Sequence, residues 1–271
     1  MEPSERSPRV SQRPGRLGIG IIGAGHVGPI LGAALAGAGH AIVGISAISQ
    51  ASRDRAEAIL PFVPILSVPD IVERSELVIL AVPDAHLESL VSGLAATGTW
   101  QAGQLVLHTS ARFGTAVLAP AQAGGAIPLA IHPAMSFTGT SIDLARLADS
   151  YFAVTAPTPV LPIGQALVVE MGAEPVIVGV ADRARYAEAV ETATAFSTSI
   201  VDQATGLLAE IGIEHPGAVI APLMRSAMEN ALARTSPDRL DLSLLEGLAL
   251  PGPDGGLTGP DERDDRDDFD E

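Results

Sequence analysis

The stretch that decides the fold is Leu17–Gly28, which reads LGIGIIGAGHVG. Its first half is an apolar run typical of a buried strand, and its second half carries three glycines in the spacing G-x-G-x-x-G. Between a strand and a helix, such glycines allow a tight turn, let a pyrophosphate approach the backbone and let the helix pack against the strand. The stretch therefore predicts a dinucleotide-binding turn. The residues expected to contact the dinucleotide there are Gly23, Gly25, His26, Val27 and Gly28.

Apolar runs alternate with helical patterns beyond this turn. Further strands are expected at residues 41–45, 65–66, 77–82, 104–108, 125–131, 152–155 and 176–178. Alternation of this kind predicts an α/β fold with a doubly wound, mostly parallel Rossmann-like sheet. Two long helical patterns, at 182–211 and 216–233, then predict a smaller all-helical domain. The expected organisation is a disordered start at 1–16, a Rossmann-like domain at 17–180, a helical domain at 181–250 and a disordered acidic tail at 251–271.

The composition excludes several classes of function. The chain has 271 residues and a net charge of −16, and it contains no Cys and no Lys. Without Cys there are no disulfides or thiolate metal sites, and the six His lack the close spacing of metal ligands, so no metal is expected. The negative charge argues against nucleic acid and anionic membranes as partners. Glycines and polar residues interrupt the apolar stretch at 17–52, so no membrane anchor is expected and the location is predicted to be cytoplasmic.

The end of the second expected strand bears on the choice of cofactor. NAD enzymes place an acidic residue about 20 positions after the glycines, where it binds the ribose hydroxyls. Here residues 45–49 read ISAIS, and Arg53 and Arg55 follow closely. The hydroxyls of Ser46 and Ser49 together with Arg53 suit the 2′-phosphate of NADP, which an acid would repel. The pattern favours NADP; the alternative is that both arginines belong to the solvated face of a helix.

Polar side chains follow three of the predicted core strands. Val82, Pro83 and Asp84 end one strand and are expected to lie near the nicotinamide ribose, because ligands bind beyond the carboxyl ends of parallel strands. His132 follows a later strand and can protonate a developing alkoxide or amide during hydride transfer. His132 and Ser110 are therefore the predicted catalytic residues, although a His here can also simply cap a turn.

The small-molecule substrate is expected to contact further polar groups near the same strand ends. These substrate-binding candidates are Thr109, Ser136 and Asn230, the last on the second C-terminal helix. A solvent-facing role for Asn230 is the alternative. Without Lys, a Tyr–Lys pair cannot supply the proton, which leaves His, Ser, Thr, Tyr or water.

Several segments together resemble a known family. They are GIGIIGAGHVG, AVPD, HTS, IHPAMSFTGTS and VVEMGAEP, followed by Tyr186. The combination resembles the actinobacterial proteins in which a Rossmann-like domain precedes a domain of unknown function, DUF2520, over roughly residues 17–235. That family is similar to ketopantoate and pyrroline-5-carboxylate reductases, and its genes often lie beside those of pantothenate biosynthesis. The resemblance implies an NADP-dependent oxidoreductase that reduces a small keto or imine compound and forms a homodimer through its helical domain.

The chain departs from the family pattern at three places. Ala111 follows HTS where the family has Gly, and Ala195-Phe196 stands where the family has an Asn-His pair. After Leu257-Thr258-Gly259-Pro260 the chain ends in an acidic tail where the family continues through further helices, so the helical domain is expected to be truncated. These departures favour an alternative in which the chain is a non-catalytic NADP-binding or regulatory protein.

Overall fold

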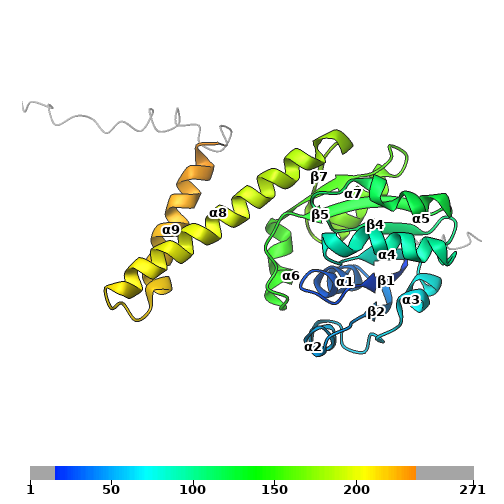
Figure 1. The fold of residues 1–271 in the computed structure, drawn as a ribbon, viewed down its shortest axis with the longest axis horizontal. Helices are drawn as coiled ribbons and strands as arrows, with labels where there is room; N and C mark the ends of the chain where they lie inside the picture. Colours follow the sequence, from blue (N-terminus) through cyan, green and yellow to red (C-terminus); the bar gives the residue numbers. More distant parts are fainter. Residues whose placement is uncertain (1–15, 236–271) are drawn as a thin grey trace, which may run out of the picture. The chain divides into compact units, whose positions relative to one another are not determined.

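Within residues 16–235, the part of the chain that the computed structural model describes, seven strands form one sheet (Figure 1). The strands are β1 (Gly18–Ile22), β2 (Ala41–Ser46), β3 (Leu77–Leu80), β4 (Leu105–His108), β5 (Ile127–Pro133), β6 (Tyr151–Thr155) and β7 (Glu174–Ile177). Their order is β2-β1-β3-β4-β5-β6-β7, and every neighbouring pair is parallel except β5 with β6. The predicted doubly wound, mostly parallel α/β sheet is confirmed.

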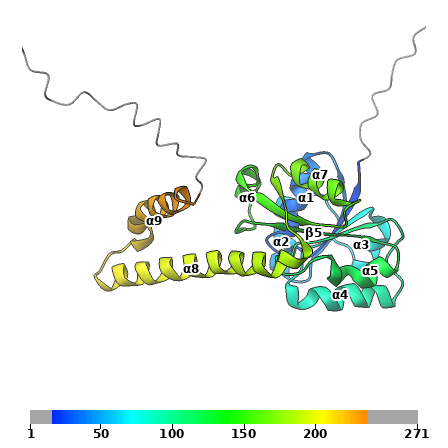
Figure 2. The ribbon, with the colours of Figure 1, turned by 90° about the horizontal axis from the view of Figure 1, so that it is seen from above.

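Helices cover both faces of the sheet (Figure 2). Helices α1, α6 and α7 lie on one face, and α3, α4 and α5 lie on the other. The helices of this unit are α1 (Gly28–Gly37), α2 (Gln50–Ile59), α3 (Val68–Arg74), α4 (Asp84–Ala96), α5 (Ala119–Ala123), α6 (Ile142–Arg146) and α7 (Leu161–Glu170). Short 3-10 turns form at η1 (Thr115–Leu118), η2 (Leu147–Asp149) and η3 (Val180–Asp182).

Two apolar clusters, one on each face, hold these layers together. Alternate strand residues such as Ile19 and Ile79 pack beneath α1 and α7, whereas Val78 and Leu80 pack beneath α3 and α4. Successive strand side chains point to opposite faces, so a strand covered on both sides must be apolar throughout. This requirement explains why β3, which reads LVIL, is buried at every position.

The sheet brings the carboxyl ends of its central strands to one edge. Strand β1 pairs with β2 on one side and with β3 on the other. The strand order therefore changes direction at β1, since the chain first builds the sheet outward to β2 and then continues on the opposite side of β1 with β3. Ligands bind at such a switch point, just beyond the strand ends, in open α/β sheets. The residues that follow β1, β3, β4 and β5 therefore form the edge where a functional site is expected.

The second unit of the chain is helical. Contacts divide the chain after Ala195, within α8 (Arg183–Glu210), and the described part of the second unit continues into α9 (Pro216–Ala233). Both helices begin and end within about one residue of the expected positions. Several large apolar side chains on α8 and α9 are exposed within the described chain.

Three observations complete the comparison with the expected elements. Residues 65–66 do not form a strand, and Ile65 makes only an isolated bridge to Ile45. The bridge consists of two hydrogen bonds, from the Ile45 N–H to the Pro64 carbonyl oxygen and from the Leu66 N–H to the Ile45 carbonyl oxygen, and the ladder does not continue beyond them. The expected disorder at 1–16 and 251–271, apart from Arg16, lies outside the described residues, as does the stretch 236–250 of the expected helical domain. Among the described residues, no helix is both long and apolar enough to cross a membrane.

Candidate functional site

The glycine-rich turn after β1 has the geometry that its spacing predicts. Gly23 has φ +108°, and a side chain there would overlap the carbonyl oxygen of Ala81 at the end of β3. A side chain at Gly28 would overlap the carbonyl oxygen of Gly23, so the helix can approach the strand only with glycine at this position. A Cβ at Gly25 would meet no atom within 4 Å, so the backbone there faces open space. These are the requirements for a backbone that a phosphate can approach.

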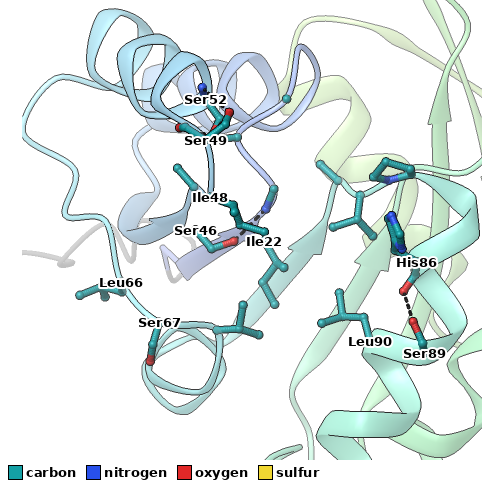
Figure 3. Close-up of a pocket in the computed structure, with 18 residues that line it drawn as sticks. Ile22, Ser46, Ile48, Ser49, Ser52, Leu66, Ser67, His86, Ser89 and Leu90 are labelled. Carbon is teal, nitrogen blue, oxygen red and sulfur yellow. Dashed lines mark hydrogen bonds between the residues drawn. The ribbon is translucent and has the colours of Figure 1, made fainter.

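A cavity of about 700 Å³ opens beside this turn (Figure 3). One wall comes from the end of β2 and the start of α2, and the opposite wall comes from the segment after β3 and the first turns of α4. Its lining residues are Ile22, Gly23, Ala24, Gly25, Ser46, Ala47, Ile48, Ser49, Ser52, Leu66, Ser67, Val68, Ala81, Val82, Pro83, His86, Ser89 and Leu90. Hydroxyl groups on an otherwise apolar surface suit a ligand with a flat ring and a polyhydroxylated sugar.

The structure places only some of the predicted cofactor residues at the cavity. Six of them line it: Gly23, Gly25, Ser46, Ser49, Val82 and Pro83. Ser46 also fixes the turn, since its hydroxyl oxygen accepts a hydrogen bond from the Gly23 N–H at 3.1 Å. Five predicted residues do not line the cavity: His26, Val27, Gly28, Arg53 and Asp84.

Four polar residues of the cavity wall were missed by the sequence prediction: Ser52, Ser67, His86 and Ser89. Ser52 lies in the first turn of α2, where its N–H and hydroxyl both bond to the N-cap residue Ser49. His86 lies in the first turn of α4, shortly after the predicted Val82–Asp84 segment. The signal for Ser52 and His86 was the helix start itself, because residues in the first turn of a helix that follows a strand face the same edge as the strand end.

The two arginines of α2 differ in their surroundings. Arg53 is exposed and is not among the residues that line the cavity. Arg55 is partly buried, and its Nη1 donates a hydrogen bond to the carbonyl oxygen of Ala24 at 3.1 Å, inside the glycine turn. The cation that actually contacts the turn is therefore Arg55.

A second group of polar residues lies around the buried guanidinium of Arg183, which contacts the turn after β4, the middle of β5 and the last residues of β6. This side chain is 2% exposed, and its five N–H groups point at neutral acceptors. Nε donates to the Thr155 hydroxyl at 2.7 Å. The remaining bonds run from Nη1 to the carbonyl oxygens of Ser110 and Ala111 (3.3 and 3.5 Å) and from Nη2 to those of Ala130 and Ala153 (2.7 and 3.0 Å). Burial lowers the pKa of Arg183 to about 10, so it still carries its charge at neutral pH.

His108 and Ser110 hold the turn after β4. The His108 ring bonds to the Gly114 carbonyl through Nε2 at 3.0 Å and accepts from the Ser110 N–H through Nδ1 at 3.2 Å. Ser110 is buried, and its hydroxyl oxygen accepts from the N–H groups of Arg112 and Phe113. Burial lowers the pKa of His108 to about 4. Both side chains therefore shape the turn, and the Ser110 oxygen is already used as an acceptor.

His132 pairs with a residue that the sequence analysis did not place in the site. Its Nδ1 lies 2.8 Å from the hydroxyl oxygen of Tyr186, and the two rings meet edge to face with centroids 5.6 Å apart. Burial first, and the nearby charge of Arg183 second, lower the pKa of His132 to about 4, while Asp84 opposes this shift. At pH 7 only about one imidazole in a thousand is then protonated. At neutral pH His132 is consequently an uncharged hydrogen-bonding group and not a protonated imidazolium that could serve as an acid.

The other predicted substrate contacts are scattered. Thr109 is partly buried at the end of β4, and Ser136 is exposed in the segment after β5. Asn230 is exposed on α9, in the second unit. No three His, Asp or Glu side chains among residues 16–235 gather in a way that could hold a metal ion.

Both Arg183 and Tyr186 were missed because they lie at the start of α8, in a stretch that reads as an ordinary amphipathic helix. A signal was present: the spacing of three places both side chains on one helix face, and a cation in a first turn opposes the helix dipole. A charge in an unfavourable position indicates that tertiary contacts hold it there.

Comparisons with known proteins agree with this architecture. The family model of the Rossmann-like domain matches residues 1–133, and that of the domain of unknown function DUF2520 matches residues 150–269. A search of curated proteins finds no match.

Three solved structures illustrate the likeness in fold. A "putative NADP oxidoreductase" from Bacteroides fragilis has 17% identity and a TM-score of 0.68, with 86% of this chain and 88% of that chain covered. A 1-pyrroline-5-carboxylate reductase from Streptococcus pyogenes has 18% identity and a TM-score of 0.61, covering 87% and 86%. An imine reductase from Pseudomonas has 14% identity and a TM-score of 0.60, covering 84% and 79%.

Replacing Arg183 should destabilise the protein far more than replacing its exposed neighbour. Arg183→Met removes the five hydrogen bonds that the buried guanidinium donates to Thr155, Ser110, Ala111, Ala130 and Ala153. Because a hydrogen bond to a charged group contributes about 1.5–3 kcal/mol, we expect the free energy of unfolding in urea to fall by at least about 3 kcal/mol. Arg185→Met, on the exposed side of the same helix, should change it by less than about 0.5 kcal/mol. Equal effects of the two substitutions would contradict a stabilising role for Arg183.

Proposed function

Because the chain belongs to the family that joins a Rossmann-like domain to a DUF2520 domain, we propose that it is an NADP-dependent oxidoreductase that reduces a small keto or imine compound. The observation that carries the proposal is the pairing of two features on one edge of the sheet. One is the cavity at the glycine turn, and the other is the His132–Tyr186–Arg183 group. The similar solved structures include a pyrroline-5-carboxylate reductase and an imine reductase, enzymes whose names describe reduction of a C=N bond.

The residues at the cavity fit a nicotinamide dinucleotide. Open backbone at Gly25 gives a pyrophosphate room to approach, and the hydroxyls of Ser46 and Ser49 lie where a ribose binds in this fold. Residues 45–49 carry no acid, so nothing there repels a 2′-phosphate. When bound, NADPH supplies a hydride. Val82 and Pro83 line the cavity and directly precede Asp84, whose charge acts on His132, so they would flank its reactive end.

The chain's own residues would then have to bind the substrate and supply a proton. His132 at the end of β5 is the titratable group nearest to this task, and Ser110 shapes the neighbouring turn. The buried charge of Arg183 favours negative charge near the His132–Tyr186 pair, such as a substrate carboxylate or a developing alkoxide. Carboxylate-bearing cyclic imines and 2-keto acids, among them the keto acid of pantothenate biosynthesis, are therefore the substrate class proposed.

We also propose that the helical unit forms a homodimer. Large apolar side chains exposed within the described part of the second unit include Phe196, Leu207, Ile211, Leu223 and Leu232. Several exposed large apolar side chains on two consecutive helices are typical of a face that binds another subunit. Light scattering after size exclusion should give twice the mass of the chain, and Leu223→Glu with Leu232→Glu should give the monomer. A monomeric parent protein would contradict the proposal.

The choice of cofactor can be tested through the two arginines of α2. We expect NADPH to bind more tightly than NADH. Arg53→Ala should weaken NADPH only, whereas Arg55→Ala should weaken both cofactors because Arg55 bonds to the Ala24 carbonyl inside the glycine turn. Calorimetric titration with NADPH and with NADH measures these affinities. Gly25→Ala serves as a control, because it adds a methyl group in open space and should abolish binding of both cofactors without unfolding the protein. Equal affinities of the parent for NADPH and NADH would rule out the NADP preference.

Turnover is the direct test of the proposed activity. NADPH oxidation is followed by absorbance with 1-pyrroline-5-carboxylate, other cyclic imines and a series of 2-keto acids. His132→Ala should lower kcat by about 10²–10⁴-fold with NADPH binding intact, and Ser110→Ala should lower it less. Tight NADPH binding without turnover on any compound would instead favour a non-catalytic, NADP-binding role, the alternative that Ala195-Phe196 suggests.

A further inference from the structure

Resting on the proposed reductase activity, we infer that the Tyr186 hydroxyl donates the proton to the reduced substrate and that His132 positions and resupplies it. Tyr186 is half-buried on the first turn of α8, and its hydroxyl lies 2.8 Å from His132 Nδ1 at the end of β5. The edge-to-face contact of the two rings fixes the phenol at this point. The catalytic residue of the pair is thus the tyrosine, and the histidine acts through it.

The hydrogen bonding of His132 suits a relay better than direct proton donation. Nδ1 faces Tyr186, whereas Nε2 makes no hydrogen bond within residues 16–235. No buried side-chain nitrogen or oxygen in this part of the chain lacks a partner, so Nε2 must reach solvent. In the tautomer with hydrogen on Nδ1, the imidazole donates to the tyrosine oxygen and leaves the phenolic proton free for another acceptor. The ring can then take a proton from water at Nε2 and pass one on at Nδ1.

The electrostatics of the pair favour a neutral histidine beside a tyrosine that can ionise. The low pKa of His132, about 4, keeps the imidazole neutral across the physiological range. Burial raises the pKa of Tyr186, and the charge of Arg183 opposes that rise. The other charged or titratable groups that act on the pair are His108 and Asp84, which act on His132. A phenol that keeps its proton at rest but gives it up beside a cation meets the requirement for a general acid.

Arg183 supplies that cation. Its Cζ lies 5.8 Å from the centre of the Tyr186 ring, and its hydrogen bonds within the described residues go to carbonyl oxygens and a hydroxyl, none of them charged. The charge is therefore not cancelled by a carboxylate partner, and in this low-dielectric site it stabilises the phenolate. The chain has no Lys, and Arg183 is the cation that the structure brings close to the Tyr186 ring.

The step balances in atoms and electrons. The substrate carbon of a C=O or C=N bond accepts the hydride supplied by NADPH, and the electron pair of that bond moves to the heteroatom. The O–H bond of Tyr186 breaks and its proton goes to the heteroatom, which gives an alcohol or an amine and leaves a phenolate. His132 donates its Nδ1 proton to the phenolate while Nε2 takes a proton from solvent, which restores the phenol and leaves the ring protonated at Nε2. Proton exchange with water then returns the ring to the Nδ1 tautomer before the next turnover. An iminium substrate already carries the proton and needs no donation, so the inference applies to ketones and neutral imines.

Tyr186→Phe is the matched test, because it removes only the hydroxyl. With the substrates of the turnover panel, we expect kcat to fall by about 10²–10⁴-fold, while the Kd for NADPH and the Tm stay close to those of the parent. The second tyrosine of the chain, Tyr151, is exposed, so Tyr151→Phe should leave all three quantities unchanged. A Tyr186→Phe enzyme that keeps nearly full kcat would overturn the inference even though the parent reduces the substrate.

His132 as a positioning residue needs a different measurement. In His132→Gln the amide can still donate to Tyr186 but cannot relay a proton, so we expect kcat to fall and to recover in part with added imidazole. An effect on KM alone, or no rescue, would contradict the relay.

Two spectroscopic measurements test the proposed proton positions on Tyr186 and His132 even if no compound in the panel is reduced. In Tyr151→Phe the ultraviolet absorbance of tyrosinate reports Tyr186 alone, and its midpoint should rise in His132→Phe, which removes the donor that stabilises the phenolate. Nitrogen NMR of isotope-labelled histidine should show His132 protonated at Nδ1. Protonation at Nε2, or an unchanged tyrosine midpoint, would overturn the inference; the absence of turnover with the expected spectra would count against the proposed substrate class only.

Discussion

The guanidinium of Arg183 contacts the turn after β4, the middle of β5 and the last residues of β6, and its hydrogen bonds tie these three segments to the first turn of α8. Removing such a cation from water is costly, and the lowered pKa of Arg183 reflects that cost. Its position is favourable only because every N–H direction meets an oxygen. Since all those oxygens are uncharged, the positive charge stays available to its surroundings. The same contacts that hold these segments together therefore also place the positive charge that acts on the pKa values of His108, His132 and Tyr186.

The consequences reach both histidines. Arg183 contributes to the low pKa of His108 and of His132, after the larger effect of burial, while Asp84 acts in the opposite direction on each. Asp84 begins α4, directly after Val82 and Pro83, which line the cavity at the glycine turn. One short segment thus forms part of the cavity wall and carries the acid whose charge acts on both histidines. A ligand that changes the position of this segment would also change the charge balance around His108 and His132.

The sequence predicted those features that depend on local pattern. The glycine turn, the buried β3 and the two C-terminal helices follow from spacing and periodicity, which act over a few residues. It could not predict that Arg55 rather than Arg53 contacts the turn, because both lie on the same helix and only the rotation of α2 against α1 decides between them. Tyr186 was missed for a similar reason: its partner His132 is 54 positions away, and only the sheet topology brings them together.

The departures from the family pattern affect the two proposals differently. Ala111 contributes to the Arg183 network through its carbonyl oxygen, which every residue type has, and it does not have the positive φ that would call for glycine. Loss of the family's glycine there leaves the network intact. Ala195 and Phe196, in contrast, are exposed and lie where the two units divide. An Asn-His pair at that place would offer polar contacts, whereas Phe196 adds apolar surface. The departures therefore leave the His132–Tyr186–Arg183 group of this chain untouched, and the Ala195-Phe196 departure bears on the surface of the helical unit, where the proposed homodimer would form.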